Sequence, residues 1–347
     1  MVQSLSTASY QLTTSNPSKN KKRPQKRTHI YGRYSLTQFI ALKDVISAFE
    51  RYTNKPGTVI FKNNIICKPQ TKTYSEIGTA FEYLLVLTLY RKHKTLFLSK
   101  IEFEIADRAA HSYEVFEYGR IWKKNKRYLK EYAYGKSSLN RRVLKAFIVL
   151  ARLVSMGRAI FSDPMPYLEE IEPLALEDLK ALLSLVPWDK FTPKKYAIIN
   201  PRFGQVGTWI AGADGDLIVD GTLIDVKTVQ KMPVRAWEQL AGYYLLHKNN
   251  GLISSENAEE HNHLRRLEYS KARSKELIRG HERRIKMFRS HIVRKIRISK
   301  VACYFSRHGL FQEADVESLI CNKKNEKYLW NIFTGKTKIK HPQQNFF

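Results

Sequence analysis

Apolar positions recur at helical spacing through much of the first half of the chain. Residues 75–92, with Ser75 as a suitable N-cap, place one apolar stripe on a helix through Ile77, Phe81, Leu84, Leu85 and Leu89. The same spacing predicts helices over residues 138–161 and 177–186. Residues 34–195 are therefore expected to form a mainly helical region, which contributes one core helix, 75–92, to the domain that follows.

The pattern changes after this helical region, where β-branched residues and glycine-rich turns replace the helical spacing. The segment "DLIVDGTLIDVK" (216–227) indicates a hairpin, because Asp220-Gly221 is a strong signal for a two-residue type I′ turn between apolar runs. Residues 233–248 predict a further helix, and residues 294–311 return to strand alternation. The expected fold class is α/β.

Besides Asp220 in the turn, four charged side chains lie on the strands of this otherwise apolar hairpin. Counting outward from the turn pairs Val219 with Thr222, Ile218 with Leu223, Leu217 with Ile224, Asp216 with Asp225 and Asp214 with Lys227. Because side chains alternate along a strand, the four charged residues are expected on one face. Two directly opposed carboxylates are destabilising, and a divalent cation with oxygen ligands would offset them. The alternative is a surface hairpin with exposed acids and an incidental Asp214–Lys227 ion pair.

Lysine and arginine outnumber the acidic residues by 60 to 32, which gives a net charge of +28 at pH 7. This balance favours nucleic acid as the partner, because each neutralised phosphate releases condensed counterions. A basic ribosome- or membrane-associated protein is the alternative. The sequence has no apolar run of about eighteen residues, no secretory signal and only three widely spaced cysteines. We therefore expect a cytoplasmic protein without a membrane segment.

Several segments concentrate the basic charge. Residues 1–33 indicate a basic disordered tail, residues 252–296 a basic helical insertion, and residues 321–347 a C-terminal tail. In residues 118–136, basic side chains are interleaved with aromatic ones. These side chains could contact nucleic acid, with the aromatic rings stacking on bases. We favour the alternative, a helix whose basic face is solvated and whose aromatic face lies in the core. The residues expected to contact nucleic acid in these segments are Lys123, Lys124, Arg265, Arg266, Arg283 and Arg284.

Four stretches together resemble the PD-(D/E)xK nuclease superfamily, in its RecB-like and Cas4-like branch. "DLIVDGTLIDVK" resembles the signature itself, an Asp at the end of one strand followed by Asp-x-Lys on the next. "WEQLAGYYLL" resembles the Gln-x-x-x-Tyr helix, with Gln239 and Tyr243, and "EIGTAFEYLLVL" resembles an upstream helix that places an acid, here Glu82, near a metal. "KVACYFSRHGLF" resembles the late strand that completes the sheet.

The resemblance implies a restriction-endonuclease-like core, a short mixed sheet flanked by helices, formed by residues 196–251 and 297–320. It implies Mg²⁺ or Mn²⁺ as the cofactor, and no iron–sulfur cluster because the four-cysteine cluster is missing. It implies that Asp216, Asp225 and Glu82 bind the metal, with Asp214 and the Val226 backbone as further candidate ligands. Lys227 would be the catalytic lysine. Gln239 would brace the site or contact the substrate, and Tyr243 would contact nucleic acid.

The expected function is metal-dependent hydrolysis of phosphodiester bonds by an activated water, with DNA favoured as substrate. One alternative is a non-catalytic nucleic-acid-binding or assembly protein on a degenerate nuclease core. Another is an RNA-directed nuclease, because a site that acts on phosphate tolerates either sugar. Nothing in the sequence selects an oligomeric state.

Overall fold

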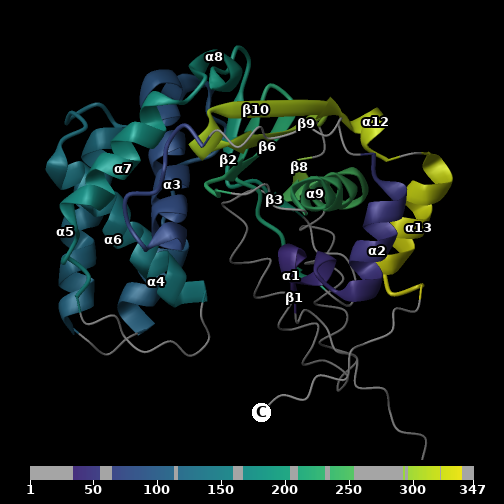
Figure 1. The fold of residues 1–347 in the computed structure, drawn as a ribbon, viewed down its shortest axis with the longest axis horizontal. Coiled ribbons are helices and arrows are strands. Elements are labelled where there is room, and N and C mark those ends of the chain that lie inside the picture. The colour runs from purple at the N-terminus through teal and green to yellow at the C-terminus, as the bar shows by residue number, and fades with distance from the viewer. Residues whose placement is uncertain are drawn as a thin grey trace, which may run out of the picture.

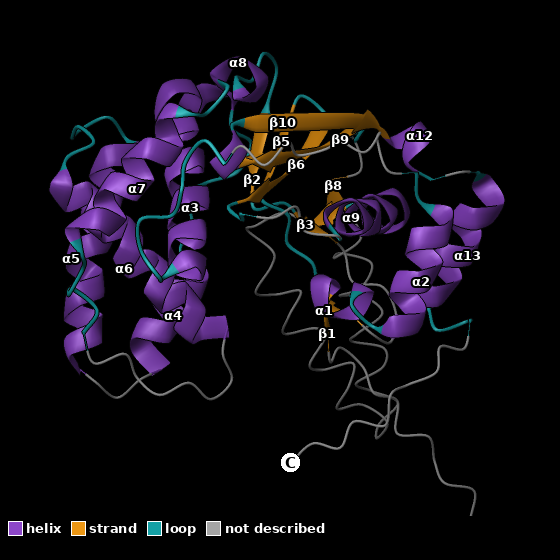
Figure 2. Ribbon diagram, in the orientation of Figure 1, coloured by secondary structure: helices purple, strands orange, loops and turns teal. Residues whose placement is uncertain are grey.

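The computed structural model describes residues 34–54, 65–112, 116–158, 167–203, 210–230, 235–253, 292–293, 296–320 and 322–337. They form an α/β structure in which a five-stranded mixed sheet lies between two groups of helices (Figure 1). Figure 2 shows the same arrangement coloured by helix and strand. The predicted α/β class is confirmed, while the predicted tail 1–33 and most of the insertion 252–296 lie outside the described residues.

The sheet has the strand order β10-β9-β6-β5-β2. Its strands are β2 (Ala197–Ile199), β5 (Leu217–Val219), β6 (Thr222–Lys227), β9 (Lys300–Phe305) and β10 (Leu310–Asp315). Neighbouring strands are antiparallel except for β6 and β9, which run parallel. β6 and β9 are buried over most of their length, as suits strands covered on both faces.

The β5–β6 hairpin turns through two residues with positive φ. Asp220 has a φ of 47° and Gly221 a φ of 86°, as the predicted type I′ turn requires. The Asp220 carboxylate accepts hydrogen bonds from the backbone amides of Lys194 (2.7 Å), Lys195 (2.8 Å) and Tyr196 (2.9 Å). The turn is therefore fixed to the segment that leads into β2.

One group of helices shares an apolar cluster with the sheet. α3 (Tyr74–His93) and α6 (Arg141–Arg158) supply many of its buried side chains, and Ile224 and Val226 of β6 supply others. The group lies on the left in Figure 1 and also contains η1 (Lys94–Leu96), α4 (Glu104–Ser112), α5 (Phe116–Ala133), α7 (Pro173–Ser184) and α8 (Trp188–Phe191).

The helices predicted from periodicity are present with shifted ends. The helices over 138–161 and 177–186 are confirmed as α6 and α7, although residues 159–161 lie outside the described residues. α7 begins earlier than predicted, at Pro173, whose fixed φ suits a first helical position. The predicted Ser75 cap is wrong, because α3 already includes this residue and its N-cap, Thr73, makes no side-chain capping bond.

The second group of helices shares an apolar cluster with the other face of the sheet. It consists of α1 (Leu36–Ile40), α2 (Lys43–Tyr52), α9 (Ala236–Asn250), α12 (Val316–Leu319) and α13 (Lys323–Phe333). α9 confirms the helix predicted over 233–248, and it lies against β9 and β6. A Cβ at Gly242 would lie 2.8 Å from Ile40 Cδ1, so this glycine allows α9 to approach α1 closely.

Two parts of this second group differ from the predicted domain plan. α1 and α2 fall within the predicted helical region 34–195, yet their apolar side chains join the α9 cluster. Phe39 and Phe49 pack on Phe333 of α13, with ring centroids 5.5 and 5.9 Å apart. The predicted C-terminal tail 321–347 is therefore wrong over α13, which is part of the core.

Short strands complete the described structure. β1 (Tyr34–Ser35) pairs with β4 (Ile210–Gly212), and β7 (Leu252–Ile253) pairs with both β3 (Arg202–Phe203) and β8 (Ile292–Val293). β7 and β8 thus bring the two ends of the predicted insertion together. The 3-10 helix η3 (Ser306–His308) joins β9 to β10. None of the described helices is long and apolar enough to cross a membrane.

A candidate metal centre at the end of the hairpin

The β5–β6 pairing holds next to the turn and ends before the carboxylates. The three residue pairs predicted beside the turn are confirmed. The predicted Asp214–Lys227 pairing is wrong, because residues 213–216 bond to residues 200–203 instead. Backbone amides of Asn200, Phe203 and Gly215 donate to the carbonyls of Asp216 (3.0 Å), Ala213 (3.0 Å) and Pro201 (2.9 Å). Asp214 Oδ1 consequently lies 4.0 Å from Arg202 Nε.

Asp216 immediately precedes β5, where β5 and β6 part. Its Oδ2 accepts a hydrogen bond from the backbone amide of Val226 at 2.6 Å, which fixes the side chain against β6. Burial and the nearby Asp225 carboxylate raise the pKa of Asp216 to about 7, although Lys227 opposes the shift. Val226, whose backbone is a predicted ligand, therefore also holds Asp216 in place through its amide.

Asp225 and Lys227 form an ion pair that is connected to α9. Lys227 Nζ lies 2.7 Å from Asp225 Oδ2 and donates to Gln239 Oε1 at 3.2 Å. Gln239 Nε2 donates to the Tyr243 hydroxyl at 2.9 Å, and that hydroxyl donates to the Asp214 carbonyl at 2.7 Å. This chain of hydrogen bonds joins β6, α9 and the end of the hairpin.

The two members of the ion pair differ in exposure. Burial raises the pKa of Asp225, while Lys227 opposes the shift. Burial lowers the pKa of Lys227, but the carboxylates of Asp225 and Asp216 raise it by more. The net pKa is raised, so the ammonium group stays charged. The Lys227 side chain is 21% exposed and that of Asp225 only 3%, so Lys227 is the member that a substrate can reach.

The Gln-x-x-x-Tyr pair of α9 braces this site. Tyr243 is 5% exposed, and its ring stacks on Phe203 with centroids 5.2 Å apart. The predicted contact of Tyr243 with nucleic acid is therefore wrong in this structure. Gln239 is 9% exposed and its side-chain oxygen and nitrogen are both hydrogen-bonded, which agrees with the predicted bracing role rather than with substrate contact.

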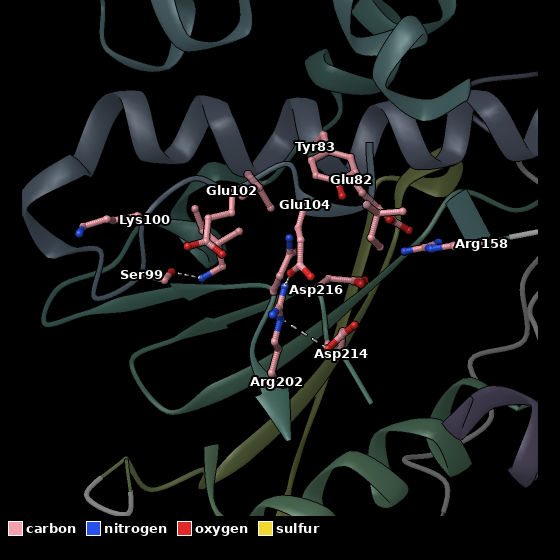
Figure 3. Close-up of a pocket in the computed structure, with 15 residues that line it drawn as sticks. Glu82, Tyr83, Ser99, Lys100, Glu102, Glu104, Arg158, Arg202, Asp214 and Asp216 are labelled. Atoms are coloured by element: carbon pink, nitrogen blue, oxygen red, sulfur yellow. Dashed lines mark hydrogen bonds and ion pairs between the residues drawn. The ribbon is translucent and has the colours of Figure 1, made fainter. Parts of the chain in front are cut away.

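Glu82 reaches the same region from α3. A Cβ at Gly78 would lie 3.5 Å from Thr228 Cβ, which places α3 against the end of β6. Burial, and then the Asp216 carboxylate, raise the pKa of Glu82 well above its usual range. Figure 3 shows Glu82, Asp214 and Asp216 lining one pocket. The other charged side chains of this pocket are Lys100, Glu102, Glu104, Arg158 and Arg202.

The pocket has more carboxylates than cationic groups, so a bound cation would offset its charge. Mg²⁺ is commonly held by one or two carboxylates, with water and phosphate oxygens as the remaining ligands. Asp216 and Glu82 fit that requirement. Among the described residues, no three His, Cys, Asp or Glu side chains gather as a metal-binding group. Asp225, the third predicted ligand, is paired with Lys227 instead of lining the pocket.

Five charged pocket residues were missing from the sequence predictions: Lys100, Glu102, Glu104, Arg158 and Arg202. Arg202 Nη2 lies 2.5 Å from Glu104 Oε2, and Arg158, the last residue of α6, is exposed at the pocket rim (Figure 3). Glu104 alternates with Glu102 in "EFE", which could have marked two acids on one face. Arg158 and Arg202 stand in no motif, and only the fold brings them here.

The predicted nucleic-acid contacts have two outcomes. Lys123 and Lys124 are exposed on α5, while Tyr118 and Trp122 of the same helix are buried. The aromatic side of residues 118–136 therefore lies in the core, as favoured, while its lysines face solvent, and their contact with nucleic acid stays a prediction. The remaining predicted contacts lie outside the described residues; these are Arg265, Arg266, Arg283 and Arg284.

Comparisons with protein-family models, curated proteins and solved structures find no match to this chain. The described geometry is thus the basis for any functional assignment. It brings together acids from a hairpin and from α3, a buried lysine ion pair and a bracing helix.

Proposed function

We propose that this chain is a metal-dependent nuclease that hydrolyses phosphodiester bonds, with DNA as its substrate. It would belong to the PD-(D/E)xK superfamily, in the RecB-like and Cas4-like branch, with the five-stranded sheet as a restriction-endonuclease-like core. The observation that carries the proposal is the meeting of Asp216, Asp225 and Lys227 at two neighbouring strand ends, with Glu82 beside Asp216. The net charge of +28 supports a polyanionic substrate.

The proposed roles follow from what each side chain contacts. Asp216 and Glu82 would hold Mg²⁺ or Mn²⁺, and Asp225 lies close enough to Asp216 to influence its charge. A divalent cation bound there would lower the pKa of a water molecule and stabilise negative charge on the phosphate. Lys227, kept charged by Asp225 and fixed by Gln239, presents a positive charge to a phosphate oxygen.

Thermal unfolding with and without metal tests whether the site is functional. A working site should raise the melting temperature in Mg²⁺ or Mn²⁺ relative to EDTA, because ligand binding stabilises by RT ln(1 + [L]/Kd). Asp216→Asn should abolish the increase, whereas Glu317→Gln, which removes a carboxylate that is 84% exposed, should retain it. No increase in the wild type would favour the binding or assembly protein.

A substrate panel decides between the DNA and RNA versions of the proposal. Labelled linear duplex DNA, circular DNA, single-stranded DNA and RNA would each be incubated with Mg²⁺, Mn²⁺ or EDTA. We expect metal-dependent cleavage of DNA. Cleavage of RNA alone would replace the proposal with an RNA-directed nuclease, and cleavage of circular DNA would identify an endonuclease.

A further inference from the structure

α5 presents two opposite faces. Its buried face carries Tyr118, Trp122, Leu129 and Tyr132, which pack in the helical cluster. Its outer face lines an open groove together with the turn that follows it. The groove residues are Lys123, Lys126, Arg127, Lys130, Glu131, Tyr134 and Lys136. Positions three, four and seven apart share one side of a helix, so the basic residues form a continuous strip.

The surrounding sequence is unusually basic. Residues 116–158, which comprise α5, the turn and α6, contain twelve lysines and arginines but only two acidic residues, Glu117 and Glu131. The rest of the chain also has excess positive charge, but the apolar side of this segment is packed in the helical cluster. Most of this charge therefore faces solvent.

Some of this charge is neutralised and some is not. Lys126 Nζ lies 2.7 Å from Asp107 Oδ1, and Arg127 Nε lies 3.6 Å from Glu131 Oε1. The three other lysines of the groove are exposed and form no ion pair with any residue that the structure describes; these are Lys123, Lys130 and Lys136. A cluster of unpaired cations is stabilised by an external anion.

We propose that this groove binds the sugar–phosphate backbone of duplex DNA. Repeated phosphates match a strip of unpaired lysines, and contacts of this kind hold DNA without reading its sequence. A membrane surface fits less well, because the apolar face of α5 is buried and cannot enter a lipid interface. The proposal extends the proposed function from bond cleavage to substrate retention, and it concerns residues that do not line the candidate metal centre.

The test compares two triple variants that remove equal charge from opposite ends of the molecule. The groove variant is Lys123→Ala, Lys130→Ala, Lys136→Ala, and the control is Lys323→Ala, Lys324→Ala, Lys327→Ala on α13, whose lysines are also exposed. Figure 1 places α5 and α13 at opposite sides of the fold. Binding of a labelled duplex of about thirty base pairs would be measured in EDTA over a salt series.

We expect the groove variant to bind the duplex about tenfold more weakly at low salt, with the slope of log K against log salt reduced by about 2 to 3. The control should keep the wild-type slope. Equal losses in both variants, or no loss in the groove variant, would overturn the proposal. Vesicles of anionic phosphatidylserine would be tested in parallel. A groove variant that loses binding to these vesicles but keeps its binding to the duplex would also overturn the proposal. Because EDTA prevents metal-dependent cleavage, a protein that binds here but never cuts DNA would still support this inference.

Discussion

At the scale of single residues, the Asp225–Lys227 ion pair couples the stability of the protein to its candidate site. Lys227→Met leaves a carboxylate that is 3% exposed without its ion-pair partner, which should lower the free energy of unfolding by about 3 kcal/mol. Urea unfolding in EDTA measures this loss. Adding Asp225→Asn removes the buried charge and should restore much of the stability. A double variant as unstable as Lys227→Met would contradict the account.

The raised pKa of Asp216 predicts metal binding that strengthens with pH. Below its pKa of about 7 the carboxyl group is mostly neutral, and above it the group is charged and able to bind a cation. Affinity for Mn²⁺, measured by calorimetry, should therefore rise between about pH 6 and pH 8. Glu317→Gln should follow the wild type, and a pH-independent affinity would argue against Asp216 as a ligand.

The same shift predicts the opposite trend for stability without metal. A carboxyl group whose pKa is raised in the folded state stabilises the protein at low pH, and this stability is lost as pH rises through about 7. Asp216→Asn carries no charge and its side-chain oxygen can still accept the Val226 amide. In EDTA its melting temperature should fall less between pH 5 and pH 8 than that of the wild type; parallel curves would reject this assignment.

At the scale of elements, Asp220 fixes the hairpin to the segment before β2. Asp220→Ala removes the acceptor of three backbone hydrogen bonds and should cost about 2 kcal/mol in the free energy of unfolding. Asp220→Asn, which keeps an acceptor oxygen and favours the same turn, should lose less. Urea unfolding compares the two, and equal losses would show that these hydrogen bonds contribute little.

The hairpin also shows how far local sequence determines structure. A two-residue turn signal and alternating apolar residues were enough to predict the register beside Gly221, because both act over a few residues. The register failed at Asp214, where residues 200–203 supply hydrogen-bond partners from outside the hairpin. The apolar spacing that predicted α3 also acts over a few residues. The meeting of Arg158 and Arg202 with Glu82 of α3 in one pocket depends instead on tertiary packing.

At the scale of the whole molecule, one buried ion pair joins α7 to η3, the turn that follows β9. Arg307 donates from Nη1 and Nη2 to the two Asp178 oxygens at 2.8 and 2.9 Å, and both residues are at most 1% exposed. Arg307→Met leaves Asp178 charged and buried, which should cost about 3 to 5 kcal/mol. Adding Asp178→Leu should recover part of this loss in urea unfolding, and no recovery would contradict the role of the pair.

The arrangement of the molecule was harder to predict than its elements. α1 has five residues and α13 shows its buried Leu329, Ile332 and Phe333 only near one end, so neither gives a strong periodic signal. α1 is buried against α9 and α13 against α2, and each of these partners is distant in the sequence. The candidate site likewise combines residues of α3, the hairpin and α9. Before the fold was known, only a motif with parts in all three segments could indicate that these residues meet.

One measurement tests most directly whether this protein is a metal-dependent nuclease. Cleavage of supercoiled and linear duplex DNA would be compared between the wild type and Asp225→Asn, each with Mg²⁺ and with EDTA. The account predicts cleavage by the wild type that requires Mg²⁺, and a loss of at least about a hundredfold in the variant, because Lys227 loses its charged partner and Asp216 its neighbouring carboxylate. Wild-type cleavage in EDTA, or an Asp225→Asn variant as active as the wild type, would contradict it.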